Sequence, residues 1–460
     1  MFTRRRKSWS RRKSWERKTQ RRPWMLTALL LLLGLPVGLE LLARLVVSLA
    51  GTSQQFETAQ SEQSKKVEAY RLKFLSPKGQ PYQELSNSGD LSVIRNPLIG
   101  YQLLPQQKNQ FWAINPQGFR DTNPIAPEKP AGEVRIFVLG GSAAFGQLSS
   151  NNEATFAHQL EQLLNSQVTG QRNNPSRYQP EVLPYLAEDV DKALALPPRI
   201  ADRQYRVINA AVPGYASGNE LAMLMLQVSN YSPDMIIVLD SYADLLLPST
   251  QSGADIPGLD EALQGTQQDM STQVSESVKS WFNQMYLVQG FQRYIQRSPL
   301  PEAASAATLN LPTTLTNSLE QTLTADPAEL DRRVQRYRNH LKQIVRWSSV
   351  NQQRLFIGIQ PEIANRQKMT PEETAIIDQL GETYAKTIKA GYTKLTAATN
   401  QLANSSSNVK LLDLRSFAAL PDQVFQSPTS LTDTANRKTA EQFYRAIAVT
   451  LALRPKPFGS

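Results

Sequence analysis

Residues 134–146 read VRIFVLGGSAAFG, and this stretch decides the fold class. Apart from Arg135, its first half is apolar and rich in β-branched residues, as in a strand buried on both faces of a parallel sheet. Two glycines then allow a sharp turn before Ser142, and small residues that favour a helix follow. Ser142 is therefore expected at the carboxyl end of a strand. There it acts either as a nucleophile whose N–H group helps to bind an oxyanion, or as a helix N-cap.

Strands and helices alternate along the rest of the chain. We expect strands at 134–139, 205–209, 235–240, 354–359 and 410–413, and helices at 152–165, 217–229, 329–348, 371–402 and 432–452. This alternation predicts a three-layer α/β fold, with a parallel sheet between helices. Active sites in such sheets lie at the carboxyl ends of the strands. Residues 166–202, rich in Asn, Pro and Gln, are expected to form a long loop.

The positive charge is concentrated at the N-terminus. Residues 1–22 hold eleven of the 50 Lys and Arg residues and one of the 40 acidic residues, so the remainder has 39 of each sign. A net charge of zero gives the globular part no electrostatic support for binding nucleic acid. The basic segment, with its tryptophans, instead predicts a cytoplasmic tail that contacts anionic membrane lipid.

An apolar segment follows this tail and has the length of a membrane span. Residues 23–50 predict a transmembrane helix, with Glu40 and Arg44 four residues apart for pairing with each other or with a partner helix. A signal peptide is the alternative, because Ser48, Leu49 and Ala50 resemble a cleavage site. As an anchor, the segment predicts a single-pass membrane protein with a cytoplasmic N-terminus and its main domain in the periplasm or a lumen.

The remaining organisation follows from composition. Residues 51–90 predict a stalk, and residues 91–460 predict the folded domain, interrupted by an insertion at about 245–328. Within this insertion, apolar residues repeat at helical spacing over 278–295. This stripe either packs on the domain or faces the bilayer or a membrane-protein partner.

Composition also excludes several kinds of chemistry. The chain has no cysteine and only two histidines, His158 and His340, which argues against a metal centre. It has neither a Walker loop nor a Rossmann fingerprint, so no cofactor is expected. Glu372 and Glu373 are an acidic pair, but they follow Thr370 and Pro371. This order predicts a capped helix start rather than a set of metal ligands.

Four segments, in this order, resemble the SGNH (GDSL-type) hydrolase family, and specifically its membrane-anchored members. They are VLGGS at 138–142, VINAAVPGY at 207–215, IVLDSYADL at 237–245 and SPTSLTD at 427–433. Phe119 and the segment LFIGIQP at 355–361 are similar to this family as well. The resemblance covers roughly residues 91–455 and implies an SGNH-hydrolase-like domain.

The resemblance implies only half of a catalytic site. Ser142 matches the nucleophile, and Gly214 matches the glycine that serves the oxyanion hole. Ala243 stands where the family has an oxyanion-binding asparagine, and Ser427 and Ser430 stand where it has the catalytic aspartate and histidine. A serine hydroxyl needs an adjacent base, and losing a triad member costs on the order of 10⁶ in turnover.

We therefore expect an SGNH-like pseudoenzyme that serves as a binding or assembly module, with a cell-envelope polysaccharide as a candidate ligand. One alternative is an active esterase or O-acyltransferase in which Ser142 uses an unconventional base or one supplied by a partner. Another is an accessory structural subunit of a membrane complex. The family resemblance alone does not separate these functions.

Overall fold

The computed structural model describes residues 53–76, 79–81, 89–96, 99–249 and 322–459. Two compact units divide the chain, Met1–Ser64 and Lys65–Ser460. No helix among the described residues is both long and apolar enough to cross a bilayer. The expected tail at 1–22, the anchor at 23–50 with Glu40 and Arg44, and the stripe at 278–295 lie outside the described residues.

The larger unit is built on a five-stranded, fully parallel sheet. Its strand order is β5-β4-β6-β7-β8, which is the doubly wound order 2-1-3-4-5 when the strands are renumbered along the chain. The strands are β4 (Glu133–Gly140), β5 (Gln204–Asn209), β6 (Met235–Asp240), β7 (Arg354–Ile359) and β8 (Val409–Asp413). All five predicted strands are confirmed to within about two residues at each end.

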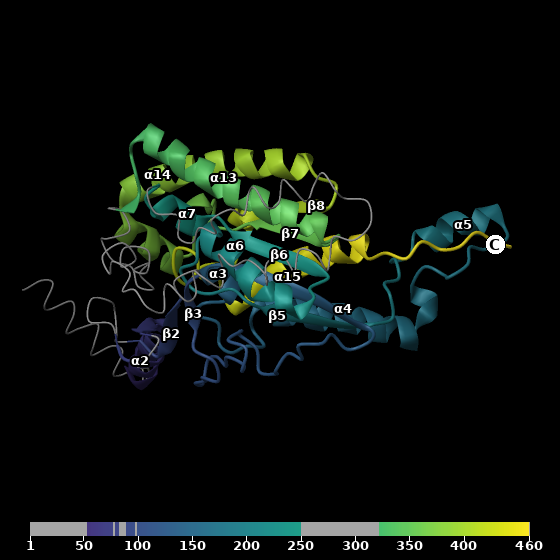
Figure 1. Ribbon diagram of the computed structural model, residues 1–460, viewed down its shortest axis with the longest axis horizontal. Helices are drawn as coiled ribbons and strands as arrows, with labels where there is room; N and C mark the ends of the chain where they lie inside the picture. The colour runs from purple at the N-terminus through teal and green to yellow at the C-terminus, as the bar shows by residue number, and fades with distance from the viewer. Residues whose placement is uncertain (1–52, 77–78, 82–88, 97–98, 250–321, 460) are drawn as a thin grey trace, which may run out of the picture. The chain divides into compact units, whose positions relative to one another are not determined.

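Helices cover both faces of this sheet (Figure 1). α4 (Phe156–Asn173) and α15 (Asp433–Thr450) pack together on one face. α6 (Ser217–Leu226), α13 (Pro327–Val350) and α14 (Pro371–Asn404) lie on the other face. α14 is kinked at Gly381, where φ is +83°. The predicted α/β architecture with helices on both sides is confirmed, and the alternating sequence pattern explains it.

The central strand β4 shows why this sequence forms a sheet interior. Every residue from Val134 to Gly140 is buried, so the strand faces helices on both sides. Arg135 interrupts the apolar run, but its guanidinium bonds to the Glu133 carboxylate and the Tyr231 carbonyl. A buried charge is tolerated when it is paired and hydrogen-bonded in this way.

A second, smaller sheet precedes the main one. β1 (Leu72–Leu75) runs parallel to β2 (Leu91–Asn96), which is antiparallel to β3 (Gly100–Leu103). Before it lies helix α2 (Ser53–Tyr70). The segment 51–90, expected as a stalk, thus contributes a strand to the folded unit, because the alternating Leu72 and Phe74 side chains are buried in the core.

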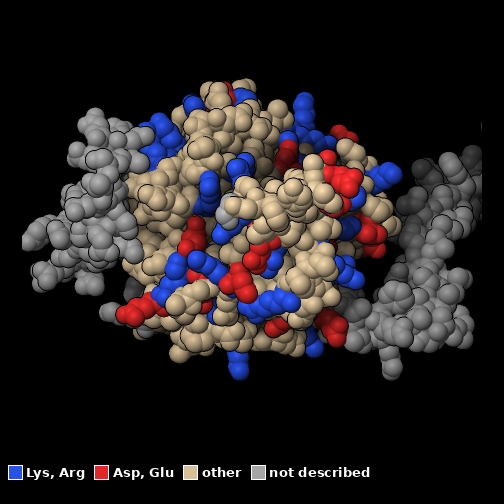
Figure 2. Space-filling model, turned by 90° about the vertical axis from the view of Figure 1, so that its right-hand side faces the viewer, with Lys and Arg blue, Asp and Glu red and all other residues tan. Residues whose placement is uncertain are grey.

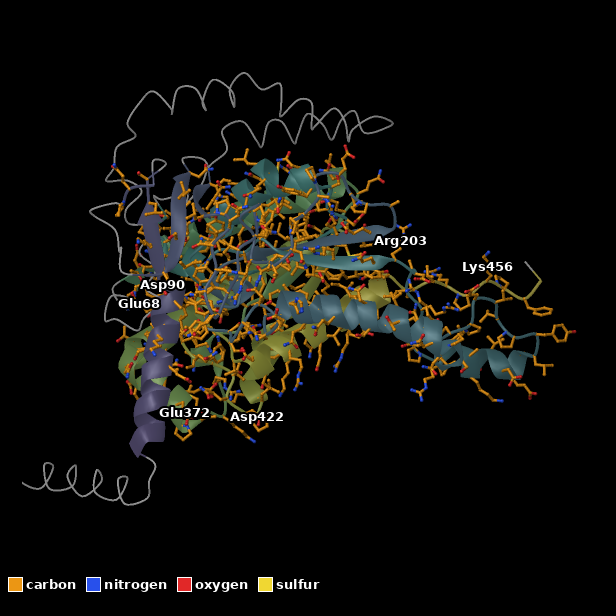
Figure 3. The ribbon with its side chains drawn as sticks, turned by 90° about the horizontal axis from the view of Figure 1, so that it is seen from below. Glu68, Asp90, Arg203, Glu372, Asp422 and Lys456 are labelled. Atoms are coloured by element: carbon orange, nitrogen blue, oxygen red, sulfur yellow. The ribbon has the colours of Figure 1, made fainter. Side chains whose placement is uncertain are left out.

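The segment expected as a long loop at 166–202 is partly helical. α4 extends to Asn173, and the short helices η1 (Pro175–Arg177) and α5 (Ala187–Leu194) follow. This segment pairs with the C-terminal residues through a bridge between Val182 and Lys456, and Figure 3 shows Lys456 well away from Asp422 and Glu372. The large hydrophobic side chains that are exposed among the described residues lie on these two segments and on the last turn of α15: Val182, Tyr185, Leu186, Leu194, Val449, Leu453 and Phe458.

Charges of both signs are interspersed on the surface. Figure 2 shows one face of the molecule, on which Lys and Arg alternate with Asp and Glu without a patch of a single sign. This agrees with the equal numbers of basic and acidic residues after the tail. Binding to nucleic acid would need a basic stripe, which this face does not offer.

Candidate functional site

Ser142 lies at the carboxyl end of β4, as predicted. Gly140 has φ +150°, and a Cβ atom there would come within 2.3 Å of the Leu239 carbonyl oxygen, so only glycine fits. Gly141 is the N-cap of the short helix α3 (Ser142–Phe145), and no side chain caps this helix. The alternative reading of Ser142 as the N-cap is therefore wrong, because Ser142 is already the first helical residue.

Two main-chain N–H groups are available beside the serine hydroxyl. Gly214, in the loop after β5, has φ +84° and lines the same cleft as Ser142. Among the described residues, no acceptor receives a hydrogen bond from the N–H groups of Ser142 and Gly214. The loop is held by Tyr101, whose hydroxyl donates to the Pro213 carbonyl at 2.6 Å. The geometry thus keeps two of the donors that an oxyanion site requires.

The end of β6 brings the third segment to the cleft. Ala243, in α7 (Tyr242–Leu246), lines the cleft but has no polar side chain to offer. Ser241 has φ +147°, a conformation that favours glycine, and its buried hydroxyl has no hydrogen-bond partner among the described residues. The resemblance places a glycine at this position, and the backbone has kept the glycine conformation although the residue is serine.

The fourth segment supplies two serines that bond to each other. Ser427 Oγ donates to Ser430 Oγ at 2.7 Å and accepts from the Ser430 N–H group at 3.0 Å. Ser427 lines the cleft, whereas Ser430 is buried with 1% of its surface exposed. The pair therefore sits where the resemblance places the aspartate and histidine, but a neutral hydroxyl cannot serve as a general base near pH 7.

The two histidines lie elsewhere. Neither His158 nor His340 lines the cleft. His158 is in the first turn of α4 and contacts Gln162. His340 is buried on α13, and its Nδ1 atom is 2.9 Å from Ser217 Oγ. No side chain of the described residues forms a hydrogen bond with Ser142 Oγ, so the hydroxyl has no proton acceptor.

The cleft itself is small and mostly uncharged, with a cavity volume of about 40 Å³. That volume admits roughly three water molecules. Its polar lining includes Ser142, Gln147, Asp240, Gln360, Ser427 and Thr429. Among the described residues, no group of three His, Cys, Asp or Glu side chains is arranged to hold a metal ion.

Sequence reasoning missed Asp240, the carboxyl residue of this lining. Its side chain is 2% exposed, and burial, followed by the charge of Asp244, raises its pKa well above the usual range. Gln147 was missed as well, and it is 4% exposed with an amide nitrogen that has no partner among the described residues. Asp240 is the last residue of the predicted strand 235–240, and its position at the carboxyl end of a parallel strand was the signal that could have identified it.

The order of the strands and the four cleft segments together identify the architecture. Ser142 follows the first strand of the parallel sheet, Gly214 the second, Ala243 the third, and Ser427 and Ser430 precede the last helix. The fold is SGNH-hydrolase-like. The expected resemblance is therefore confirmed at the level of the fold.

No family model matches the chain, and no curated protein matches it in sequence. Among solved structures, it is similar to the acetyl xylan esterase AlAXEase, with 10% identity and a TM-score of 0.34 over 68% of this chain and 100% of that one. It is also similar to a lipase/acylhydrolase from Enterococcus faecalis, with 11% identity and a TM-score of 0.32 over 70% of this chain and 98% of that one. A third similar structure is a two-domain esterase active on acetylated mannans. It has 11% identity and a TM-score of 0.33, and the match covers 72% of this chain and 53% of that one. Similarities this distant carry no argument about activity.

Proposed function

We propose that this protein is a membrane-anchored, extracytoplasmic SGNH-like module that binds a ligand in its cleft without hydrolysing it. One observation carries the proposal: the positions of the missing base hold Ser427 and Ser430, which bond to each other. Removing a triad member from a serine hydrolase lowers turnover by about 10⁶. A cell-envelope polysaccharide is the proposed ligand class, and the segment 23–50 is the proposed anchor.

The parts of the site that remain favour binding. The N–H groups of Ser142 and Gly214 and the polar lining of the cleft suit an oxygen-rich ligand. Ser142, without a base, adds a neutral hydroxyl that donates or accepts a hydrogen bond. A site that keeps its donors and lacks its base recognises a carbonyl or carboxyl group and leaves its bonds intact.

The test measures the reactivity of Ser142 in the purified full-length chain. The chain is treated with a fluorophosphonate probe and, separately, with a short-chain aryl ester, and the Ser142→Ala variant is treated in parallel. We expect neither labelling nor turnover above that of Ser142→Ala. Labelling and turnover that Ser142→Ala abolishes would instead establish an active esterase or acyltransferase with an unconventional base.

A further inference from the structure

Three carboxyl groups are buried directly behind the cleft. Glu220 on α6, Asp240 at the end of β6 and Asp244 on α7 are 0%, 2% and 1% exposed. Asp244 accepts hydrogen bonds from the Ser217 N–H and hydroxyl groups at 2.9 and 2.6 Å. Both oxygens of Glu220 and the Oδ2 atom of Asp240 receive no donor from the described residues. Glu220 and Asp240 interact electrostatically with each other, and each also interacts with Asp244.

Buried carboxyl groups that lie close together favour their protonated forms. The cation that pairs with this cluster among the described residues is Arg336, whose Nη2 atom is 3.8 Å from Asp244 Oδ1. His340 reaches Asp244 through the hydroxyl of Ser217. Three buried negative charges against one guanidinium are strongly unfavourable, and adjacent carboxyls respond by taking up a proton. The pKa of Glu220 is accordingly raised well above its usual range by burial and by the charge of Asp240.

The Asp240 carboxyl lies at the boundary between the buried cluster and the cleft. Its Oδ2 atom is buried, whereas Oδ1 lies beside Gly141, 3.7 Å from the position that a Cβ atom would take there. Asp240 also lines the cleft. When both carboxyls are protonated, Glu220 points its own proton toward Asp240, and Asp240 carries a second proton on Oδ1, on the side of Gly141 and of the cleft. A neutral carboxylic acid held in a low-dielectric site is a strong donor to an oxyanion.

We propose that Asp240, backed by Glu220, is the third hydrogen-bond donor of the cleft, in place of the amide missing at Ala243, and that the cleft binds a carboxylate group. The inference rests on the proposed function, because it names what a cleft without hydrolytic activity recognises. Three donors around a space of about 40 Å³ suit a carboxylate on a small acid or on the edge of a sugar. Loss of the Asp240 proton would replace a donor with a negative charge and expel this ligand.

Other titratable and charged groups face the cluster. The charged or ionising neighbours are Asp244, Arg336 and His340. Burial raises the pKa of the neighbouring tyrosines above their usual range, so these stay neutral: Tyr215, Tyr242, Tyr337 and Tyr392. Asp244 accepts a hydrogen bond from the Ser217 hydroxyl, and its Oδ1 atom is 3.8 Å from Arg336 Nη2. Of the three carboxyls, Asp240 is the one that lines the cleft, so its proton is the one that a ligand there meets.

The experiment measures the binding of acetate and of glucuronate to the full-length chain by saturation-transfer NMR between about pH 6 and about pH 10. Acetate represents a free small acid and glucuronate a carboxylate on a sugar. Asp240→Asn keeps a neutral donor, and Asp240→Ala removes the donor. Glu161→Gln is the matched control, because Glu161 is a carboxyl with a raised pKa on α4, outside the cleft. Circular dichroism verifies the fold of each variant.

We expect the wild-type chain to lose at least tenfold in affinity for one or both probes as the pH rises. Asp240→Asn should bind with the same affinity throughout, Asp240→Ala should bind at least tenfold more weakly at low pH, and Glu161→Gln should behave as wild type. Wild-type affinity in Asp240→Ala, a persistent pH effect in Asp240→Asn, or no binding of either probe would overturn the inference. Reactivity of Ser142 toward fluorophosphonate is a separate readout, so failure of the proposed function is recognised independently.

Discussion

Arg366 and Glu373 form an ion pair in which both side chains are fully buried, with Nη2 and Oε2 3.1 Å apart. Glu373 also accepts hydrogen bonds from the Val424 and Phe425 N–H groups at 2.8 and 3.0 Å. Arg366 donates to the carbonyls of three residues in the same segment: Phe417, Leu420 and Asp422. The pair thus fixes the chain that leads to Ser427 and Ser430. The expected cap at Thr370 is confirmed, and its capping box uses Glu373.

The first prediction concerns this pair. Glu373→Ala leaves a buried guanidinium and two buried N–H groups without their acceptor, so we expect it to lower the free energy of unfolding by about 3–5 kcal/mol. Urea unfolding followed by circular dichroism measures the change. Glu372→Ala, one residue away and exposed, is the control and should stay within about 0.5 kcal/mol of wild type. Equal effects of the two substitutions would contradict the role given to the pair.

A second prediction follows from the strained conformation of Ser241. Its φ of +147° costs about 1–3 kcal/mol for a residue with a Cβ atom, and its buried hydroxyl lacks a partner among the described residues. Ser241→Gly removes both penalties, although glycine adds entropy to the unfolded chain. We expect a net gain of about 1 kcal/mol in urea unfolding. Ser166→Gly, in the interior of α4, is the matched substitution and should lose stability by about 0.5 kcal/mol; a loss at Ser241 as well would refute the strain argument.

The third prediction is a dependence of stability on pH through Glu362. This residue is 1% exposed, it accepts a hydrogen bond from the Tyr384 hydroxyl at 2.8 Å, and burial raises its pKa to about 8 from a usual value of 4.5. Between these two values the folded chain holds a proton that the unfolded chain has lost. The stabilisation that protonated Glu362 provides is therefore fully present below about pH 4.5. It is lost as the pH rises toward 8, which lowers the free energy of unfolding by up to about 5 kcal/mol.

Unfolding by urea at several pH values tests this contribution. In Glu362→Gln the side chain no longer titrates, so the free energy of unfolding should fall less steeply over this range than in the wild-type chain. Glu153→Gln changes an exposed carboxyl and should keep the wild-type slope. Identical slopes for the wild-type chain and Glu362→Gln would show that Glu362 ionises normally.

The fourth prediction restores what the cleft lacks. A variant with Ala243→Asn, Ser427→Asp and Ser430→His should hydrolyse an aryl acetate at least ~10²-fold faster than the wild-type chain, because the base and the amide donor return to the positions that the resemblance implies. The same variant with Ser142→Ala provides the background rate. A folded triple variant that does not exceed this background would mean that the cleft geometry, and not only its side chains, has left the hydrolase arrangement.

Much of the fold was readable because each strand is short, apolar and bounded by turn residues. The strand predicted at 235–240 is Met235–Asp240, and the helix start predicted at Thr370 is the observed cap. The strand at 72–75 was missed because its partner, β2, lies beyond a polar segment and only the pairing buries Leu72 and Phe74. Local patterns reveal an element, whereas its burial depends on residues far away in the sequence.

The candidate site divides in the same way. Ser142 was found from the strand and turn that precede it, and the resemblance of four short segments to a known family implied the positions of Gly214, Ala243, Ser427 and Ser430. Asp240 and Glu220 were not found, since nothing in the sequence shows that a residue on α6 and one at the end of β6 face each other. The packing of His340 was not evident from the sequence either. This residue is buried against Ser217, 123 positions away, because α13 packs on α6.

Residue type and local periodicity were enough to predict the parallel α/β architecture and the position of Ser142 at a strand end, and the sequence has no histidine after His340. The bond between Ser427 and Ser430, the hold of Arg366 and Glu373 on their loop, and the closeness of the buried carboxyls at the cleft became evident from the folded chain alone. Hydrogen bonding and the protonation of buried carboxyls depend on distances between atoms that the chain brings together only when it packs.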